Sequence, residues 1–155
     1  MTTLELGQAV PDFELASTGD KNVKLSDYLG KNIVIYFYPK DNTPGCTLEG
    51  QQFRDNIASF NDHNTVIFGI SRDSIRKHEN FKTKHEFPFD LLADEDEIAC
   101  SIFDVVQLKK NYGREYMGIV RSSFLIDKKG ILRNEWRKVK VKDHIAEVLT
   151  AVEAL

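Results

Sequence analysis

Residues 33–54, which read IVIYFYPKDNTPGCTLEGQQFR, contain a strand followed directly by a helix. The apolar run that begins the segment is rich in β-branched and aromatic side chains and predicts a buried strand, which Pro39 ends. Turn and helix-start residues follow, namely Asn42, Thr43, Pro44 and Gly45. Apolar residues then recur at roughly helical spacing, at Leu48, Phe53, Ile57 and Phe60. The pattern therefore predicts a helix with Cys46 in its first turn.

The position of Cys46 has a chemical consequence. The unpaired N–H groups and the positive end of the helix dipole favour an anion in the first turn of a helix. For a cysteine that anion is the thiolate, which is the nucleophilic form. Thr43, three residues earlier, can direct its hydroxyl at the sulfur. Cys46 is therefore a candidate nucleophile; the alternative is a buried structural cysteine, because free cysteine often acts as a small apolar residue.

The composition is typical of one globular domain spanning residues 1–155. Hydrophobic residues make up 41% and charged residues 29% of the 155-residue chain. The net charge of −3 argues against nucleic acid as the main partner. No apolar run is long enough to span a membrane, and residues 1–7 lack the features of a secretory signal. Two cysteines do not form a disulfide framework in a chain of this length, so we expect a reducing cytoplasm.

The remaining pattern predicts an α/β fold with a mixed central sheet. Strands are expected at 13–17 and 22–25 (a hairpin), 65–71, 89–92, and 121–127 with 131–136 (a second hairpin). Helical segments are expected at 26–30, from 73 to about 84 with Ile75 and Phe81 inward, after Asp94, and at 142–155. Residues 107–120 are expected to form a loop.

Four consecutive acids, at residues 94–97, allow two interpretations. Asp94 as N-cap with Glu97 three residues later is a capping box. The same acids could hold a cation, but no calcium-loop spacing is present and acidic residues are common in a first helical turn. We favour the cap.

None of the four histidines shows metal-ligand spacing, and each is expected at the surface or at a helix end: His63, His78, His85 and His144.

The run Pro39-x-x-x-Thr43-x-x-Cys46 resembles the active-site signature of the peroxiredoxins. With residues 38–47 around it, the segment is similar to the bacterioferritin comigratory protein, or peroxiredoxin Q, branch. The resemblance covers nearly the whole chain. It implies a thioredoxin-like fold, with a central mixed β-sheet flanked by helices and an N-terminal hairpin. It also implies a monomeric thiol peroxidase without cofactor or metal, which reduces hydrogen peroxide and organic hydroperoxides.

The resemblance assigns roles to several residues. Cys46 would attack the peroxide and become a sulfenic acid, Pro39 would shield the sulfur from water, and Thr43 would donate to the peroxide or the thiolate. Arg121 would be the cation beside the sulfur; the alternative, which we disfavour, is a charge at a strand end on the surface. Glu49 would hold Arg121 or its loop, or would serve only as a partner of the helix dipole.

The sequence departs from many relatives at Gln51, where they carry a resolving cysteine five residues after the reactive one. Cys100 is the only other cysteine, and its apolar neighbours suggest a buried residue. Either an external thiol resolves the sulfenic acid, or Cys100 reaches Cys46 after local unfolding, since a disulfide needs Cα atoms within roughly 7 Å. We favour an external thiol: a thioredoxin, a glutaredoxin or a low-molecular-weight thiol.

Two other functions remain open at this point. A dithiol–disulfide exchanger could share the fold, but Cys46 is not part of a C-x-x-C pair. A non-catalytic binding or chaperone-like module could also have kept the fold without the chemistry. The complete set of Pro39, Thr43, Cys46 and Arg121 argues against the second alternative.

Overall fold

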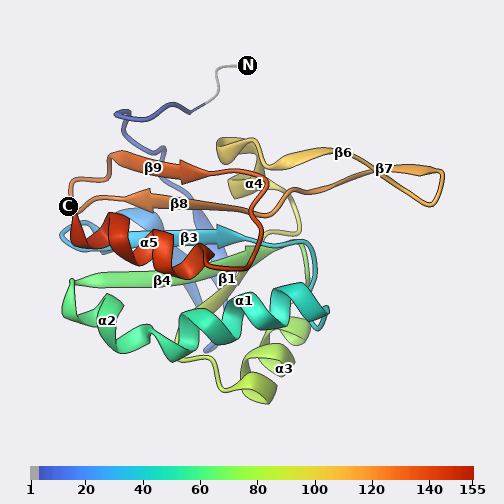
Figure 1. The fold of residues 1–155 in the computed structure, drawn as a ribbon, viewed down its shortest axis with the longest axis horizontal. Coiled ribbons are helices and arrows are strands. Elements are labelled where there is room, and N and C mark those ends of the chain that lie inside the picture. The colour runs from blue at the N-terminus through green and yellow to red at the C-terminus, as the bar shows by residue number, and fades with distance from the viewer. Residues whose placement is uncertain (1–3) are drawn as a thin grey trace.

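The computed structural model describes residues 4–155, and the expectation about the first seven residues falls partly outside this range. A seven-stranded mixed sheet forms its centre, in the order β2-β1-β5-β4-β3-β8-β9 (Figure 1). Its strands are β1 Glu14–Ser17, β2 Lys21–Lys24, β3 Asn32–Phe37, β4 Thr65–Ser71, β5 Asp90–Ala93, β8 Ser122–Ile126 and β9 Leu132–Trp136. The pairs β3–β4 and β4–β5 are parallel, and the other pairs are antiparallel.

Helices cover both faces of the sheet. They are the 3₁₀-helix Leu25–Tyr28 and the α-helices α1 Pro44–Asp55, α2 Ile57–Asp62, α3 Ile75–His85, α4 Ile98–Phe103 and α5 His144–Glu153. The two expected hairpins, the buried strands and the terminal helix are confirmed to within a few residues. In the described chain no helix has the length and apolar character that a membrane crossing requires.

β3 divides the interior into two cores, because successive side chains of a strand point to opposite faces. Its odd-numbered residues pack with the N-terminal hairpin and α4 in one core, which contains Cys100. Its even-numbered residues pack with α1, α2, α3 and α5 in the other core, which contains Cys46. The two cysteines therefore lie on opposite faces of the sheet.

The expectation of a loop at 107–120 is wrong. These residues form a second, two-stranded sheet, β6 Val106–Asn111 and β7 Arg114–Ile119, which extends away from the body of the molecule (Figure 1). Tyr112 and Gly113, with φ of 51° and 77°, form the left-handed two-residue turn that hairpins favour. Most side chains of the ribbon are exposed, so the alternation that marks a half-buried strand is missing from its sequence.

The capping box at Asp94 is also wrong in form, because α4 begins only at Ile98 and Glu97 occupies the N-cap with a left-handed φ of 57°. Asp94 nevertheless satisfies the end of the helix. Its carboxylate oxygens accept hydrogen bonds from the backbone N–H groups of Ile98 (2.8 Å) and Cys100 (2.7 Å). Across residues 4–155, no three His, Cys, Asp or Glu side chains are grouped to hold a metal ion.

The predicted inward face of the helix after Cys46 needs a correction. The helix is interrupted at Asn56, which separates α1 from α2. Phe53 and Phe60 are fully buried, but Leu48 is 46% exposed. The buried face of α1 consists of Cys46, Glu49, Gly50 and Phe53. A buried glutamate in this face is the feature that an apolar periodicity cannot reveal.

Candidate active site

Cys46 lies in the first turn of α1, directly beyond the end of β3. Thr43 is the N-cap with extended backbone angles, and Pro44 is the first helical residue. Proline suits this position because its missing N–H would have no helical partner there. The Cys46 side chain is 1% exposed and lies near the free N–H groups of the helix start. Peptide dipoles therefore favour negative charge at the sulfur.

Arg121 lies 75 residues after Cys46 in the chain but contacts it in the fold. It lies between β7 and β8, and β8 pairs with β3. Its Nη2 donates a hydrogen bond to Cys46 Sγ at 3.2 Å, and its Nη1 donates to Glu49 Oε1 at 2.6 Å. The structure thus brings Cys46, Glu49 and Arg121 together in one cluster.

Gly45 lies against the guanidinium of Arg121. A Cβ at this position would lie 3.1 Å from Arg121 Nη2, closer than a relaxed contact. An alanine at position 45 would therefore require the guanidinium to shift by a few tenths of an ångström. The sequence indicates Gly45 only as a turn residue, and nothing in the local pattern indicates its long-range neighbour.

Glu49 is a fully buried carboxyl group with an unusual environment. Burial raises its pKa from 4.5 to about 7, although the charge and hydrogen bond of Arg121 act in the opposite direction. Its Oε2 has no hydrogen-bond partner among the described residues. For Arg121, burial acts to lower the pKa, but Glu49 and Cys46 outweigh it and hold the pKa above the ordinary value. Arg121 therefore remains a cation beside the sulfur.

Thr43 and Pro39 flank this cluster in the turn between β3 and α1. The Thr43 hydroxyl donates a hydrogen bond to the backbone oxygen of Lys40 at 2.8 Å, so its proton points into the turn rather than at the sulfur. The Thr43 oxygen keeps lone pairs, and a hydroxyl can rotate when a new acceptor arrives. Pro39 is half-buried at the beginning of the same turn.

Cys100 is separated from this cluster by the sheet. Its side chain is 1% exposed in the core on the opposite face. Burial, together with the neighbouring Asp94 carboxylate, raises the pKa of the Cys100 thiol far above its usual value. Cys100 therefore combines a protonated thiol with a position remote from Cys46.

The prediction that all four histidines lie at the surface or at helix ends is wrong for His78, which lies inside α3; His144 is the first residue of α5, but it is buried. His78 is 0% exposed and His144 is 3% exposed. His78 bonds to Asp41 (Nδ1 to Oδ2, 2.7 Å), and His144 bonds to the Ser123 hydroxyl (2.8 Å). The signal for His78 was present in the sequence, because it lies three residues from both Ile75 and Phe81 and so shares their face of α3.

Comparisons with known proteins agree with one another. Residues 6–135 match the AhpC/TSA family. Peroxiredoxin Bcp of Bacillus subtilis is 58% identical over 151 residues, which cover 97% of this chain and 96% of the relative. Peroxiredoxin Bcp of Xanthomonas campestris is 44% identical over 97% of this chain and 94% of its own length.

Solved structures show the same similarity. The bacterioferritin comigratory protein of Xanthomonas campestris, studied for its alkyl peroxide reduction activity, superposes with a TM-score of 0.90 at 44% identity, covering 97% of this chain and 96% of the other. A mutant of the Xylella fastidiosa PrxQ gives a TM-score of 0.93 at 38% identity, over 99% and 98% of the two chains. These neighbours confirm the expected thioredoxin-like fold.

Proposed function

This chain belongs to the AhpC/TSA family, in its Bcp or peroxiredoxin Q branch, and is a thiol peroxidase; we propose that Cys46 is the residue that attacks the peroxide. The observation that carries this assignment is the hydrogen bond from Arg121 Nη2 to Cys46 Sγ in the first turn of α1. A fixed guanidinium and the helix dipole both stabilise negative charge on the sulfur without rearrangement during the reaction.

The proposed reaction is a displacement at oxygen. The Cys46 thiolate attacks one peroxide oxygen, the S–O bond forms as the O–O bond breaks, and the other oxygen leaves with the bonding electrons. The leaving oxygen takes up a proton to become water or an alcohol, and Cys46 becomes a sulfenic acid. Arg121 stabilises the charge that moves from sulfur to oxygen. Thr43 directs the peroxide from the N-cap, and Pro39 limits access of water.

We propose that Glu49 holds Arg121 in place. Its Oε1 accepts the 2.6 Å hydrogen bond from Nη1, which leaves Nη2 for the sulfur. A planar guanidinium with two fixed partners has a defined orientation, which a single contact would not give.

We further propose that an external thiol returns Cys46 to its starting state. The thiol sulfur attacks the sulfenic acid, water leaves and a mixed disulfide forms; a second thiol then releases Cys46. The position of Cys100 on the other face of the sheet supports this assignment, as does its raised pKa, because a protonated thiol is a poor nucleophile. A thioredoxin, a glutaredoxin or a low-molecular-weight thiol meets the chemical requirement.

We also propose that the chain acts as a monomeric single domain in the cytoplasm, and that it accepts hydrogen peroxide as well as organic hydroperoxides. The complete Cys46–Glu49–Arg121 cluster within one chain supports a monomer, because no second copy is needed to build it. Two free cysteines and a cycle that consumes thiols support a reducing compartment. No feature of the site favours a non-catalytic binding module.

Peroxide consumption in the presence of dithiothreitol tests the proposal. The parent protein and the Cys100→Ser variant should consume hydrogen peroxide catalytically, whereas Cys46→Ser should not. Serine is nearly isosteric with cysteine but is a poor nucleophile at neutral pH, so the fold should persist. A parent protein that consumes no peroxide would refute the assignment, and loss of turnover in folded Cys100→Ser would refute the external-thiol step.

A further inference from the structure

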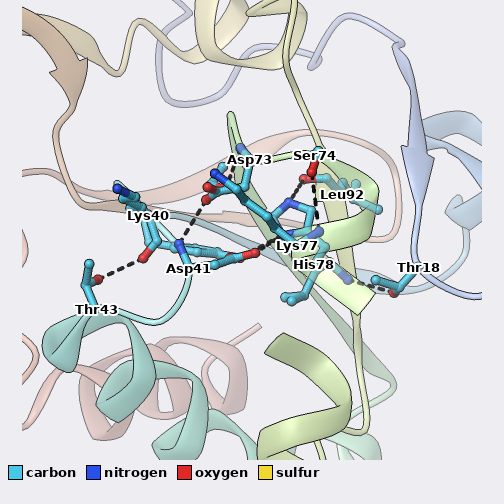
Figure 2. Close-up of polar contacts among 12 residues, drawn as sticks. Thr18, Lys40, Asp41, Thr43, Asp73, Ser74, Lys77, His78 and Leu92 are labelled. Carbon is cyan, nitrogen blue, oxygen red and sulfur yellow. Dashed lines mark hydrogen bonds and ion pairs between the residues drawn. The ribbon is translucent and has the colours of Figure 1, made fainter. Parts of the chain in front are cut away.

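A buried polar cluster lies next to the active-site turn, beyond the Cys46–Glu49–Arg121 group. We call it the Asp41 cluster: Tyr38, Asp41, Ser71, Asp73 and His78. Asp41 is its centre and belongs to the turn that joins β3 to α1. Figure 2 shows Asp41 and His78 close together, with Lys40 and Thr43 on the same turn.

Every polar atom of the Asp41 side chain is engaged. Its Oδ1 accepts a hydrogen bond from the Tyr38 hydroxyl at 2.6 Å, and its Oδ2 lies 2.7 Å from His78 Nδ1. The Asp41 backbone N–H donates to Asp73 Oδ2 at 2.9 Å, and Asp73 Oδ2 also accepts the Ser71 hydroxyl at 2.6 Å. The turn is therefore tied to the residue after β3, to the end of β4 and to α3.

The hydrogen bonds of His78 show which of its ring nitrogens carries a hydrogen. His78 Nε2 lies 2.9 Å from the backbone oxygen of Leu92 (Figure 2), and since a carbonyl only accepts, this nitrogen carries a hydrogen. Nδ1 and Oδ2 are close enough to share one further proton. The pair is thus connected at both ends, with 0% and 1% of the two side chains exposed.

Only a short stretch of backbone separates the Asp41 cluster from Thr43 and the start of α1. Asn42, directly after Asp41, has a left-handed φ of 64°, and Thr43 donates to the Lys40 oxygen at 2.8 Å. This hydrogen bond closes the turn from Lys40 to Thr43, the N-cap of α1, with Asp41 between them. We therefore expect a displacement of Asp41 to shift Thr43, and with it the start of the helix that holds Cys46.

Buried polar groups are costly unless all of them are paired, and a fully paired network fixes one geometry. An apolar side chain at position 41 could also pack beneath the turn, but it would supply no directional contacts. The Asp41 cluster supplies such contacts from three elements at once. Directional contacts of this kind suit a turn that must keep the Thr43 hydroxyl at a fixed distance from Cys46 Sγ.

We propose that Asp41 and His78 are positioning residues for the peroxidase reaction, holding the Pro39–Thr43 turn in the geometry that aligns the peroxide with Cys46 Sγ. The proposal rests on the proposed function, because it needs Cys46 to react with peroxide. Neither residue touches the reacting atoms, and both act through Thr43 and the start of α1.

The test compares two reactions of Cys46 in single-turnover experiments: oxidation by hydrogen peroxide and alkylation by iodoacetamide. Peroxide needs the aligned turn, whereas iodoacetamide needs only an accessible thiolate. Asp41→Ala and His78→Ala should each slow the peroxide reaction by about tenfold to a hundredfold, the size expected for a misaligned site. Alkylation should change less than about threefold. The double variant should lose little more than either single variant, because the two residues act as one unit.

Asp41→Asn is the conservative variant that should restore the rate. Its amide N–H can donate to a neutral His78 Nδ1 while its oxygen still accepts the Tyr38 hydroxyl, so each hydrogen bond keeps a partner. Asp94→Ala is the matched control. Asp94 is also a buried carboxylate (1% exposed) that accepts two hydrogen bonds, but these come from α4 and not from the active-site turn. It should lower the melting temperature without slowing the peroxide reaction.

All rates are measured where circular dichroism shows the variants to be folded. If an alanine variant does not fold, His78→Gln takes its place, since it keeps a donor for the Leu92 oxygen and removes the ring nitrogen that bonds to Asp41 Oδ2. A peroxide rate within twofold of the parent rate would overturn the proposal. An equal loss in both reactions would overturn it as well, because the cluster would then act on the thiolate or the fold in general. A parent protein inert to peroxide would instead refute the proposed function.

Discussion

Arg121 Nη2 and Cys46 Sγ lie 3.2 Å apart, although 75 residues separate them in the chain. The contact depends on the antiparallel pairing of β8 with β3, which places the residue before β8 beside the residues after β3. The cation and the start of α1 therefore meet at the same edge of the sheet. The sheet topology, rather than any local motif, assembles the site.

Removal of Arg121 should slow peroxide reduction strongly. Arg121→Ala deletes the one side-chain donor to Cys46 Sγ in the described structure, and loss of such a donor typically costs about a hundredfold or more in rate. The variant should also alkylate more slowly at Cys46. Stopped-flow oxidation by hydrogen peroxide measures the first effect. Arg133→Ala, which removes a half-exposed ion pair with Asp127, is the control and should react like the parent protein.

Two glycines of α1 should separate activity from stability. Gly45→Ala places a Cβ 3.1 Å from Arg121 Nη2 and should displace the guanidinium from the sulfur. We expect the peroxide rate to fall by about threefold to tenfold, with stability unchanged or slightly higher, because alanine is the better helix former. Equal peroxide rates for parent and Gly45→Ala would show that the close contact is not needed.

Gly50→Ala is the companion variant. A Cβ at Gly50 would lie 2.4 Å from Cζ of the Phe87 ring, so the core must shift. Overpacking of this kind costs about 1–3 kcal/mol in free energy of unfolding. Urea denaturation should therefore show a lower midpoint for Gly50→Ala but not for Gly45→Ala. The opposite order would contradict the packing described for this helix.

Glu49 should make the stability of the protein depend on pH. Its carboxyl binds a proton more tightly in the folded state, with a pKa of about 7, than in the unfolded state, where the ordinary value of 4.5 applies. Its contribution is therefore fully present below about pH 4.5 and is lost as the pH rises to about 7. The loss is on the order of 3 kcal/mol for a shift of this size.

Glu49→Gln removes this titration but keeps an oxygen for Arg121. Urea unfolding at about pH 5 and about pH 8 should show a smaller loss of free energy of unfolding in the variant than in the parent protein. The two proteins should differ most at the higher pH, where the parent carries a buried carboxylate. Identical pH dependence in both would mean that Glu49 does not titrate in this window.

The sequence predicted the parts of the fold that carry strong local signals. The apolar run that became β3 and the turn residues after it placed Cys46 at a helix start, as the structure has it. The β6–β7 ribbon was missed because most of its side chains face solvent and its strands lack alternation. The role of Arg121 came only from family resemblance, because periodicity does not report which residue 75 positions away is a neighbour.

The buried polar groups were the hardest to predict. His78 occupies an inward position of α3, but a histidine there does not reveal its partner, and nothing in the local pattern marks Asp41. Gly45 likewise gave no sign of the guanidinium against it. In each case the determining neighbour lies on another element, so only the assembled sheet and its helices define the contact.

The most direct test of the central claim is the mass of the reduced protein after one equivalent of hydrogen peroxide, with and without a trap for sulfenic acid. We expect the trap to label Cys46 alone, with no disulfide between Cys46 and Cys100. A Cys46 without label or mass change would contradict its role as the reactive thiol. A loss of two hydrogens, mapped to a peptide that joins Cys46 to Cys100, would contradict the one-cysteine cycle and would require the two faces of the sheet to open.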